Sequence, residues 1–394
     1  MAEKKDSFAA LVAKMAKKYD TNISSLADVA KEVESISTGN LTIDHILGVG
    51  GFPQGRLIEL YGQASSGKST LALQAAAEFQ RKVRADDPGY AGRVVLYMDH
   101  ENAMDPLYAK ALGLDVDDEQ TFLFAQPSSL EASANIAREL VNSGRVGLVI
   151  FDSVAAMLPA ASLVAETGKA SVALRARLMS QFLTAFTEEV YVHNCTAIFL
   201  NHIAEVLDMG GRPGVKRWTT PGGRALKFAA SLRLEFQQIK NITEEVHDDL
   251  TNEKIKQVQA TDVVVKVVKN KVAPPFKRAV VRVRYGKGFD NGFSAFTVLK
   301  NHKKVVEGAG GYFFFDRVPE LAVGLDLNSK DRPFIRGLHN VLAKCDADPE
   351  WKELLVKIAR QTLEEADKHE PADDPVLEVD TDSEGDGDGT DSDD

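Results

Sequence analysis

Gly62-Gln63-Ala64-Ser65-Ser66-Gly67-Lys68-Ser69 is the stretch that decides the fold. It fits the pattern Gly-x-x-x-x-Gly-Lys-Ser/Thr, and it stands between a short apolar run, Leu57 to Tyr61, and a helical pattern, Thr70 to Val83. The glycines let backbone N–H groups turn toward a phosphate, and the N-terminus of the following helix adds a favourable dipole. The stretch therefore predicts a nucleotide phosphate loop, in which Lys68 reaches the β- and γ-phosphates and Ser69 binds Mg²⁺.

Further apolar runs follow the loop, each succeeded by a helix or a turn. They are Val94 to Met98, Phe122 to Ala125, Leu148 to Phe151 and Ala197 to Leu200, with a helical pattern over Leu130 to Val141. Short apolar runs alternating with helices predict parallel strands buried on both faces. The fold class is therefore α/β, a doubly wound, mostly parallel sheet.

Carboxylates follow two of these strands. Asp152 ends the strand candidate that begins at Leu148, which makes it the expected second Mg²⁺ ligand, although an aspartate after a strand is often only a turn former. Asp99 and Glu101 follow the strand candidate that begins at Val94. Ligands of open parallel sheets bind at the carboxyl ends of the strands, so one of these two groups is expected to orient the attacking water.

The charge of the chain is concentrated at its end. The formal net charge is −11, and residues 371–394 contain eleven aspartates and glutamates but no lysine or arginine. Removing these eleven from the 58 acids leaves 47, which equals the 47 lysines and arginines, so residues 1–370 are formally neutral. The sequence predicts a disordered acidic tail, either a solubilising segment or a regulatory one.

The remaining bulk features bound the setting of the protein. Its 394 residues, 44% of them hydrophobic, are enough for one full α/β core with smaller appendages. The two cysteines, Cys195 and Cys345, are too few for a disulfide framework, and no signal peptide or membrane span is recognisable. A cytoplasmic protein without a membrane partner is expected.

Four segments are expected along the chain. Residues 1–34 form an N-terminal helix, Phe8 to Tyr19, with a linker, and residues 35–290 form the ATPase core. A hairpin of Val263 to Val268 and Val280 to Tyr285 should extend the sheet. Residues 291–370 form a small α/β lobe, and residues 371–394 form the tail. The elements expected in the lobe are a strand, Tyr312 to Phe315, and two helices, Arg336 to Ala343 and Glu353 to Ala366.

Longer strings around these motifs resemble the RecA recombinase family. They include Leu60-Tyr61-Gly62, the run from Ser65 to Thr70, Asp152-Ser153-Val154-Ala155-Ala156, Met179-Ser180-Gln181, Gly222-Gly223 with Ala225-Leu226-Lys227-Phe228, and Val267-Val268-Lys269-Asn270-Lys271, all in family order. Glu101 with Ala103, Asp105, Pro106 and Tyr108 resembles the family's catalytic-glutamate stretch. The resemblance covers residues 35–290 closely, the segment to about residue 340 more loosely, and the rest hardly at all.

The resemblance implies a role for several further residues. Phosphate and nucleotide contacts fall to Gly62, Ser65, Ser66, Gly67, Lys68, Ser69, Thr70, Asp105 and Tyr108, with Tyr108 stacked on adenine. Glu101 polarises the attacking water, while Lys269 and Lys271 reach the γ-phosphate bound by a neighbouring subunit, as arginine fingers do. Phe228 is the expected interface aromatic, and the N-terminal helix the polymerisation helix. The plain alternatives are an inward-packed Tyr108 and a lysine-rich strand end.

The resemblance places DNA contacts on two loops. The first, Val164 to Ala173, contains Lys169 and leads to Arg175 and Arg177, and the second runs from Ile203 to Gly222. The basic and aromatic residues expected in the second loop are Arg212, Lys216, Arg217 and Trp218. Both loops also contain acids, so a surface lid unrelated to DNA is the alternative.

Two features depart from the family pattern. His202 stands where RecA proteins have glutamine in the γ-phosphate-sensing segment, and the charge of an imidazole, unlike that of an amide, can change near neutral pH. This departure indicates a divergent branch, such as a viral one. Residues 84–92 are extra sequence and predict a surface loop.

Taken together, the sequence predicts an ATP- and Mg²⁺-dependent, DNA-dependent ATPase. The resemblance implies that it forms helical filaments on single-stranded DNA, pairs it with double-stranded DNA and catalyses strand exchange in recombination and repair. A ring-forming helicase or motor of the same fold is the alternative, and a small-molecule P-loop kinase is a weaker one.

Overall fold

The computed structural model describes residues 2–19, 33–164, 170–206, 217–248 and 253–369. These residues separate into two compact units, Met1–Glu34 and Ser35–Asp394. The first unit contains the helix α1 (Ala2–Lys18), which begins before the predicted Phe8 and ends one residue before the predicted Tyr19; Phe8, Leu11 and Tyr19 are exposed. The elements described below belong to the second unit.

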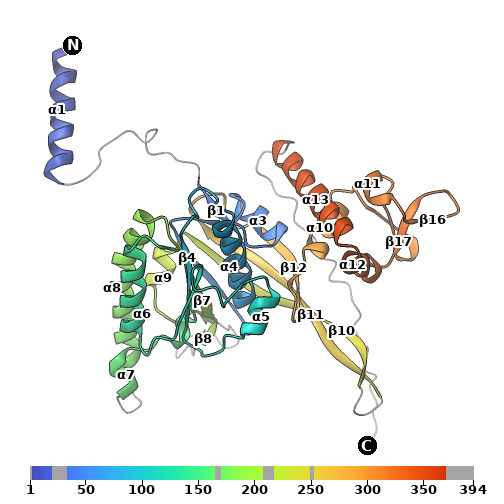
Figure 1. The fold of residues 1–394 in the computed structure, drawn as a ribbon, viewed down its shortest axis with the longest axis horizontal. Coiled ribbons are helices and arrows are strands. Elements are labelled where there is room, and N and C mark those ends of the chain that lie inside the picture. Colours follow the sequence, from blue (N-terminus) through green and yellow to red (C-terminus); the bar gives the residue numbers. More distant parts are fainter. Residues whose placement is uncertain (1, 20–32, 165–169, 207–216, 249–252, 370–394) are drawn as a thin grey trace, which may run out of the picture. The chain divides into compact units, whose positions relative to one another are not determined.

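A nine-stranded sheet forms the centre of the core (Figure 1). Its order is β13-β12-β11-β10-β3-β7-β6-β4-β5. The parallel strands are β3 (Leu57–Gly62), β4 (Val94–Asp99), β5 (Phe122–Ala125), β6 (Val146–Asp152) and β7 (Thr196–His202). All five strands predicted from apolar runs are confirmed. Burial on both faces keeps the runs of β3, β4, β6 and β7 continuous, whereas β5 lies at the end of the sheet and is only partly buried.

Helices cover both faces of the parallel strands. On one face α4 (Lys68–Arg84) packs through Leu71, Ala75 and Phe79, and α5 (Pro106–Ala111) adds Ala109. On the other face α6 (Leu130–Asn142) and α8 (Ala170–Val192) pack around Phe151 and Phe199, whose rings stack with centroids 4.4 Å apart. This three-layer arrangement brings the carboxyl ends of the strands, and the motifs that follow them, to one edge of the sheet.

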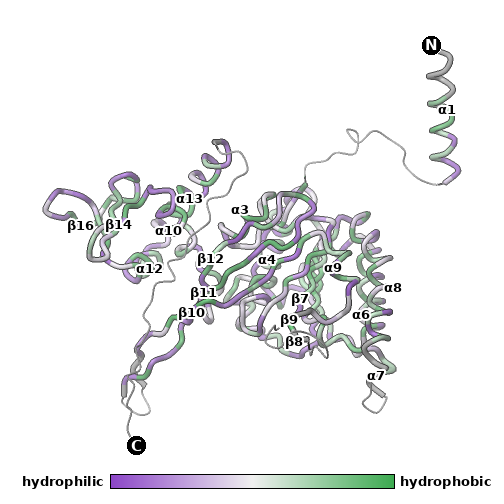
Figure 2. Tube along the Cα trace, turned by 180° about the vertical axis from the view of Figure 1, so that it is seen from behind, coloured by the Kyte–Doolittle hydropathy of each residue, from purple (hydrophilic) through white to green (hydrophobic). Residues whose placement is uncertain are grey.

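The hairpin predicted near residues 263–285 is part of a longer structure. β10 (Leu232–Asp248) and β11 (Glu253–Asn270) form an antiparallel ribbon, and β12 (Arg278–Arg284) and β13 (Gly288–Phe289) continue the sheet. Figure 2 shows hydrophilic and hydrophobic stretches alternating along the ribbon. Such alternation has no continuous apolar run, which is why β10 and the start of β11 were not predicted.

Residues 291–369 build a lobe with its own core. Its four-stranded sheet has the order β14-β15-β17-β16, from β14 (Val306–Gly308), β15 (Tyr312–Phe314), β16 (Asp326–Leu327) and β17 (Pro333–Arg336). Its helices are α10 (Asn291–Asn301), α11 (Pro319–Ala322), α12 (Leu338–Ala347) and α13 (Pro349–His369). The helix predicted from Arg336 instead begins at Leu338, because Arg336 pairs with Tyr312 in the sheet and Gly337 has φ 81°.

The remaining elements are short. They are β1 (Ser35–Ile36), α3 (Leu41–Leu47), β2 (Phe52–Pro53), α7 (Ala160–Val164), β8 (Ala204–Val206), β9 (Arg217–Thr219), α9 (Ala225–Ala229) and the single turns η1 (Val154–Ala156) and η2 (Ala309–Gly311). The prediction of a loop from Ile203 to Gly222 was wrong near both of its ends, where β8 and β9 form an antiparallel pair of strands. The first loop is shorter than predicted, because α8 already begins at Ala170. Of the surface loop predicted over residues 84–92, Arg84 is the last residue of α4, and residues 85–92 contain only turns and connecting backbone.

Candidate active site

The phosphate loop connects β3 to α4, and glycine is required at both of its ends. A Cβ on Gly62 would lie 2.3 Å from the carbonyl oxygen of Phe236 on the neighbouring strand. Gly67 is the N-cap of α4 with φ 89°, and a Cβ there would lie 3.0 Å from Val283 and 3.1 Å from the Phe289 ring. The loop is therefore fixed by close packing against β10, β12 and β13.

The Lys68 ammonium is folded into this loop. Its Nζ donates to the carbonyl oxygens of Gln63 at 2.6 Å and Gly62 at 3.3 Å. Burial lowers the pKa of Lys68 to about 8, and the charges of Asp152 and Glu101 oppose that shift. The Lys68 Nζ also donates to the Ser66 hydroxyl at 3.5 Å. A buried cation whose hydrogen-bond partners are uncharged oxygens gains from an anionic oxygen nearby, so the loop suits a phosphate.

Asp152 lies beside Ser69, the first-turn residue of α4. The Ser69 hydroxyl hydrogen-bonds the Asp152 carboxylate, and the Tyr97 hydroxyl donates to Asp152 Oδ2 at 2.7 Å. Burial raises the pKa of Asp152, and these two hydrogen bonds oppose the rise. A carboxylate and a hydroxyl at adjacent positions are the oxygen donors that Mg²⁺ prefers, so the residues present fit the expected ion.

The two acids that follow β4 have separate positions. Asp99 is buried and accepts hydrogen bonds from the backbone N–H of Glu101 at 3.0 Å and of Met104 at 3.1 Å. Glu101 is exposed toward the loop edge, where its Oε1 accepts from the Ser153 hydroxyl and lies 3.2 Å from His202 Nε2. Asp99 therefore holds the turn, and only Glu101 is left to face a substrate.

Sheet register explains why these side chains meet. Asp99 of β4 is level with Asp152 of β6, and Gly62 of β3 is level with His202 of β7. Because the four strands are adjacent and parallel, their carboxyl ends share one edge. The residues that the sequence assigned to phosphate, Mg²⁺ and water therefore come together.

Tyr108 and Asp105 lie on α5. The Asp105 carboxylate caps that helix by accepting from the N–H groups of Leu107 at 2.9 Å and Tyr108 at 3.2 Å. The half-buried Tyr108 ring packs against the core, and its hydroxyl is 2.9 Å from Thr70 Oγ1. Tyr108 thus touches the helix that follows the phosphate loop, in partial agreement with the inward-packed alternative.

Lys269 and Lys271 lie away from this edge. Lys269 is the penultimate residue of β11, and Lys271 directly follows the strand. Lys269 is level with Arg233 of β10, and Arg233 is level with Glu59 of β3. The Lys269 Nζ donates to the carbonyl oxygens of Lys227 and Phe228, both at 2.9 Å. From Glu59 to Gly62 is about 10 Å along a strand, and two strand spacings add about 10 Å across the sheet. The structure does not bring the two lysines to their own phosphate loop.

Phe228 belongs to the same surface as the lysines. It lies on α9 with 72% of its side chain exposed, unusual for a phenylalanine next to a core. Burial, with repulsion from Lys271 and Arg233, lowers the pKa of Lys269. An exposed ring and a partly buried cation therefore occur together at this position.

The expected DNA residues are only partly visible. Lys169, Arg212 and Lys216 lie outside the described residues, and Arg217 and Trp218 are described only as backbone of β9. On α8, Arg175 donates to the carbonyl oxygen of Ala155 at 3.1 Å, whereas Arg177 is exposed.

Sequence reasoning missed three contributors to the site. The Ser153 hydroxyl donates to Glu101, and the Tyr97 hydroxyl donates to Asp152. Arg233 forms a buried ion pair with Glu59 at 2.6 Å. Ser153 directly follows a recognised aspartate, and Tyr97 lies two residues before Asp99, so both had a positional signal. The Arg233–Glu59 pair had none, because it depends on the pairing of β10 with β3.

Comparisons with known proteins agree with this geometry. The family model described as the RecA N-terminal domain matches residues 7–290. Protein RecA of Lactobacillus acidophilus is 38% identical over 365 residues, 90% of each chain. Protein RecA of Staphylococcus carnosus is 44% identical over 260 residues, 66% of each chain. Protein RecA of Limosilactobacillus reuteri is 46% identical over 261 residues, 65% of this chain and 64% of the relative.

The fold and the loop between β3 and α4 define a P-loop nucleotide-binding protein with a mostly parallel sheet. The family match and these relatives then give the particular group: the chain belongs to the RecA family. Proteins of this family are DNA-dependent ATPases of recombination and repair that use ATP and Mg²⁺. Among the described residues, no helix is long and apolar enough to cross a membrane.

Proposed function

We propose that this chain is a DNA-dependent ATPase that assembles as a helical filament on single-stranded DNA and catalyses homologous pairing and strand exchange. The observation that carries the proposal is the division of cationic groups between two edges of one sheet. Lys68 lies at the carboxyl ends of the strands, and Lys269 and Lys271 lie at the opposite edge, out of reach of the same phosphate loop. Repetition of the chain along a filament would bring the two edges of neighbouring copies together.

The phosphate site works mainly by positioning. The loop residues Gly62, Ser65, Ser66, Gly67, Lys68, Ser69 and Thr70 hold the triphosphate, and Ser69 and Asp152 hold the Mg²⁺ ion, which neutralises phosphate charge when bound. Glu101 accepts a hydrogen bond from the attacking water and orients it toward the γ-phosphorus. Tyr108 lies at the adenine position, and His202 contacts Glu101 from the strand that leads to the second loop.

Lys269 and Lys271 act in trans on the γ-phosphate of the neighbouring copy, as arginine fingers do, so hydrolysis depends on assembly. Support comes from their position at the edge away from their own phosphate loop and from the exposed Phe228 ring beside them. We place the N-terminal helix, in segment 1–34, in the same polymer contact.

DNA binding falls to the two segments after α7 and β8 within the core, residues 35–290. Arg175 and Arg177 supply positive charge from α8, and Lys169, Arg212, Lys216, Arg217 and Trp218 complete the assignment. Residues 291–370 form a separate lobe and residues 371–394 an acidic tail that competes with DNA phosphate.

Imaging separates this function from a ring-forming motor. Negative-stain micrographs of the full chain with single-stranded DNA and a slowly hydrolysed ATP analogue are expected to contain continuous helical filaments. Closed rings under the same conditions would overturn the proposal in favour of a helicase-like motor, and the Lys68→Ala protein is the control for nucleotide dependence.

A further inference from the structure

Two strands at the centre of the sheet carry a polar side chain where their neighbours are apolar. Asn201 of β7 follows the buried run Ala197 to Leu200, and Glu59 of β3 lies between Ile58 and Leu60. Both polar side chains are fully buried, with 0% of their surface exposed. Placing an amide and a carboxylate in such a core costs free energy unless each finds partners. Their hydrogen bonds must therefore offset that cost.

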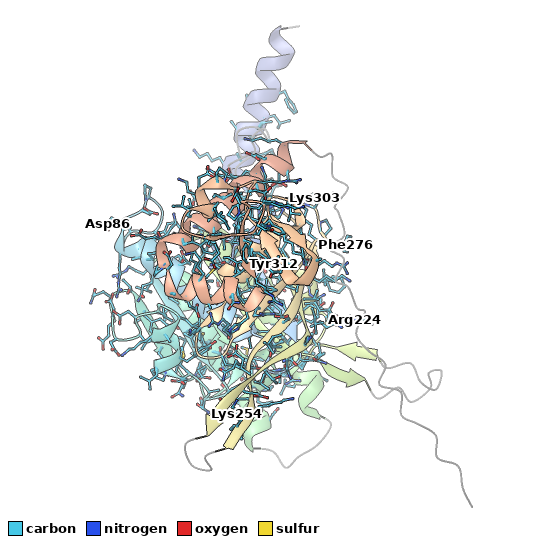
Figure 3. All side chains as sticks on the ribbon, turned by 90° about the vertical axis from the view of Figure 1, so that its right-hand side faces the viewer. Asp86, Arg224, Lys254, Phe276, Lys303 and Tyr312 are labelled. Carbon is cyan, nitrogen blue, oxygen red and sulfur yellow. The ribbon has the colours of Figure 1, made fainter. Side chains whose placement is uncertain are left out.

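The amide group of Asn201 uses both of its hydrogens and its oxygen. Its Nδ2 donates to Glu59 Oε1 and to the carbonyl oxygen of Pro221, both at 3.0 Å, and its Oδ1 accepts from the backbone N–H of His202 at 3.0 Å. An amide turned by half a rotation would place an oxygen against two oxygens, so only one orientation allows all three bonds. Asn201 thus joins the end of β7 to β3 and to the segment that leads into α9, whose N-cap Arg224 is labelled in Figure 3.

Glu59 is in turn held by Arg233 of β10. The Arg233 Nε donates to Glu59 Oε2 at 2.6 Å, so the two oxygens of the carboxylate serve different partners. The guanidinium carbon of Arg233 also lies 4.6 Å from the centroid of the Tyr61 ring. A buried ion pair often adds little stability over a well-packed apolar pair of the same volume. What this pair does add is a fixed acceptor, Glu59 Oε1, for the Asn201 amide.

The Asn201 amide reaches the phosphate-loop edge of the sheet through the backbone of His202. His202 is the last residue of β7, and the next N–H, that of Ile203, donates to the carbonyl oxygen of Gly62 at 3.3 Å. Successive side chains of a strand point to opposite faces, so the Asn201 amide lies on one face of the sheet and the His202 ring on the other. There His202 Nε2 lies 3.2 Å from Glu101 Oε1. Fixing the His202 backbone therefore fixes the position of the ring beside Glu101.

We propose that Asn201 is a positioning residue for ATP hydrolysis, which ties His202, and through it Glu101, to the buried ion pair between β3 and β10. The inference rests on the proposed role of Glu101 and extends it to a side chain on the opposite face of the sheet. The Ser153 hydroxyl and His202 both contact Oε1 of Glu101, which assigns the other carboxylate oxygen to the water. A displacement of the ring by about 1 Å would turn that oxygen, and a misplacement of this size can slow a reaction about a hundredfold.

A double-mutant cycle tests this path. Asn201→Asp keeps the size and the acceptor of the side chain, but it removes both Nδ2 donors and places a second carboxylate beside Glu59. His202→Ala removes the ring that contacts Glu101. With saturating DNA and ATP, each variant should lower the turnover per nucleotide site about tenfold, and the double variant should also stay near tenfold, because both changes break the same path. Nucleotide sites are counted by fluorescent-nucleotide titration, so that a loss of folded protein does not lower the value.

Asn40→Asp is the matched control for this cycle. Asn40 is also fully buried, and its Nδ2 donates to the Ser294 hydroxyl at 3.0 Å, which joins α3 to α10. This variant should lower the midpoint of thermal unfolding without changing the turnover per site. If Asn201→Asp binds no nucleotide, Asn201→Ser takes its place in the cycle, since it adds no charge beside Glu59.

Two results would overturn the inference. Additive losses, about a hundredfold in the double variant, would mean that Asn201 does not act through His202. An unchanged turnover per site in Asn201→Asp, with a lowered midpoint of unfolding, is the result expected of a purely structural residue. Both leave the proposed function intact, whereas a wild-type protein without DNA-dependent hydrolysis would contradict that function and this inference together.

Discussion

The central sheet has two edges at which its strands end, one at the carboxyl ends of the parallel strands and one at their amino ends, and their side chains are arranged differently. At the carboxyl ends of β3, β4, β6 and β7, the side chains contact one another directly, as in the bonds of Asp152 with Tyr97 and of Glu101 with Ser153. At the opposite edge Lys269 rests on backbone carbonyls of α9, and Phe228 is exposed to solvent.

The difference indicates at which of the two edges a single copy of the chain contains all the groups that a site needs. One edge gathers, within a single copy, the groups assigned above to phosphate, metal and water, whereas the other offers the half-buried cation of Lys269 and the largely exposed ring of Phe228. In the function proposed above, these groups form half of a site and a second copy supplies the other half.

The largest effect is expected on ATP hydrolysis, from a substitution at the carboxyl ends of the parallel strands. Glu101→Gln should lower the ATP hydrolysis rate about 10²- to 10⁴-fold, because only the water-orienting carboxylate is lost. ATP and DNA binding should remain, and filaments should persist longer. Single-turnover hydrolysis with DNA measures the effect, and Lys68→Ala is the comparison, since it should weaken ATP binding instead. Hydrolysis at the unmutated rate would remove Glu101 from this role.

A smaller effect is expected from Tyr97, which bonds to the expected Mg²⁺ ligand Asp152. Tyr97→Phe removes the hydroxyl that holds Asp152 Oδ2, and should raise the Mg²⁺ concentration needed for tight nucleotide binding about tenfold. Fluorescent-nucleotide titrations across Mg²⁺ concentrations measure this without hydrolysis.

Tyr90→Phe is the matched control for this experiment. Its hydroxyl is buried too, but it donates to Ser35 and accepts from Gln54, far from the site in the sheet. It should cost stability with no change in the Mg²⁺ requirement. Identical Mg²⁺ titrations for Tyr97→Phe and the wild type would contradict the positioning role.

At the opposite edge, the contribution of Lys269 to DNA-dependent ATPase activity should depend on pH. Because burial and the neighbouring cations lower the pKa of Lys269, its charge is lost at a lower pH than that of an ordinary lysine, and the trans contribution should decline with it as pH rises. Lys269→Arg keeps its charge, so the alkaline fall in DNA-dependent ATPase should move to higher pH. Lys266→Arg, an exposed lysine on the same strand, is the control. An alkaline limb unmoved by Lys269→Arg would be the contrary result.

The smallest effect is expected from the tail. Ending the chain at Glu370 should speed assembly on duplex DNA by a factor of about two to five at low salt, because the eleven acids compete with DNA phosphate. High salt should remove the difference, and free Mg²⁺ should partly imitate the truncation. Stopped-flow assembly rates for both lengths test this, and equal rates at every salt concentration would leave the tail a solubilising segment.

The groups at the carboxyl ends of the parallel strands could be predicted from the sequence because each of them follows its strand closely along the chain. Lys68, Asp152 and Glu101 each follow a continuous apolar run, and parallel topology brings such positions to one edge. β10 and the start of β11 were missed because their residues alternate between hydrophilic and hydrophobic, and with them the Arg233–Glu59 pair, which joins positions 174 residues apart. The contacts among the Tyr312, Phe314 and Phe334 rings were also missed, because stacking across β15 and β17 depends on a register that single strands do not display.

The most direct test of the divided site is a mixing experiment. A Lys269→Ala/Lys271→Ala protein and a Lys68→Ala protein, each inactive alone, are combined with single-stranded DNA while co-assembly is followed by fluorescence transfer between labelled copies. The account predicts that DNA-dependent ATPase partly returns, since some junctions join an intact phosphate loop to intact lysines. Co-assembly without any return of hydrolysis would contradict the trans role of the lysines.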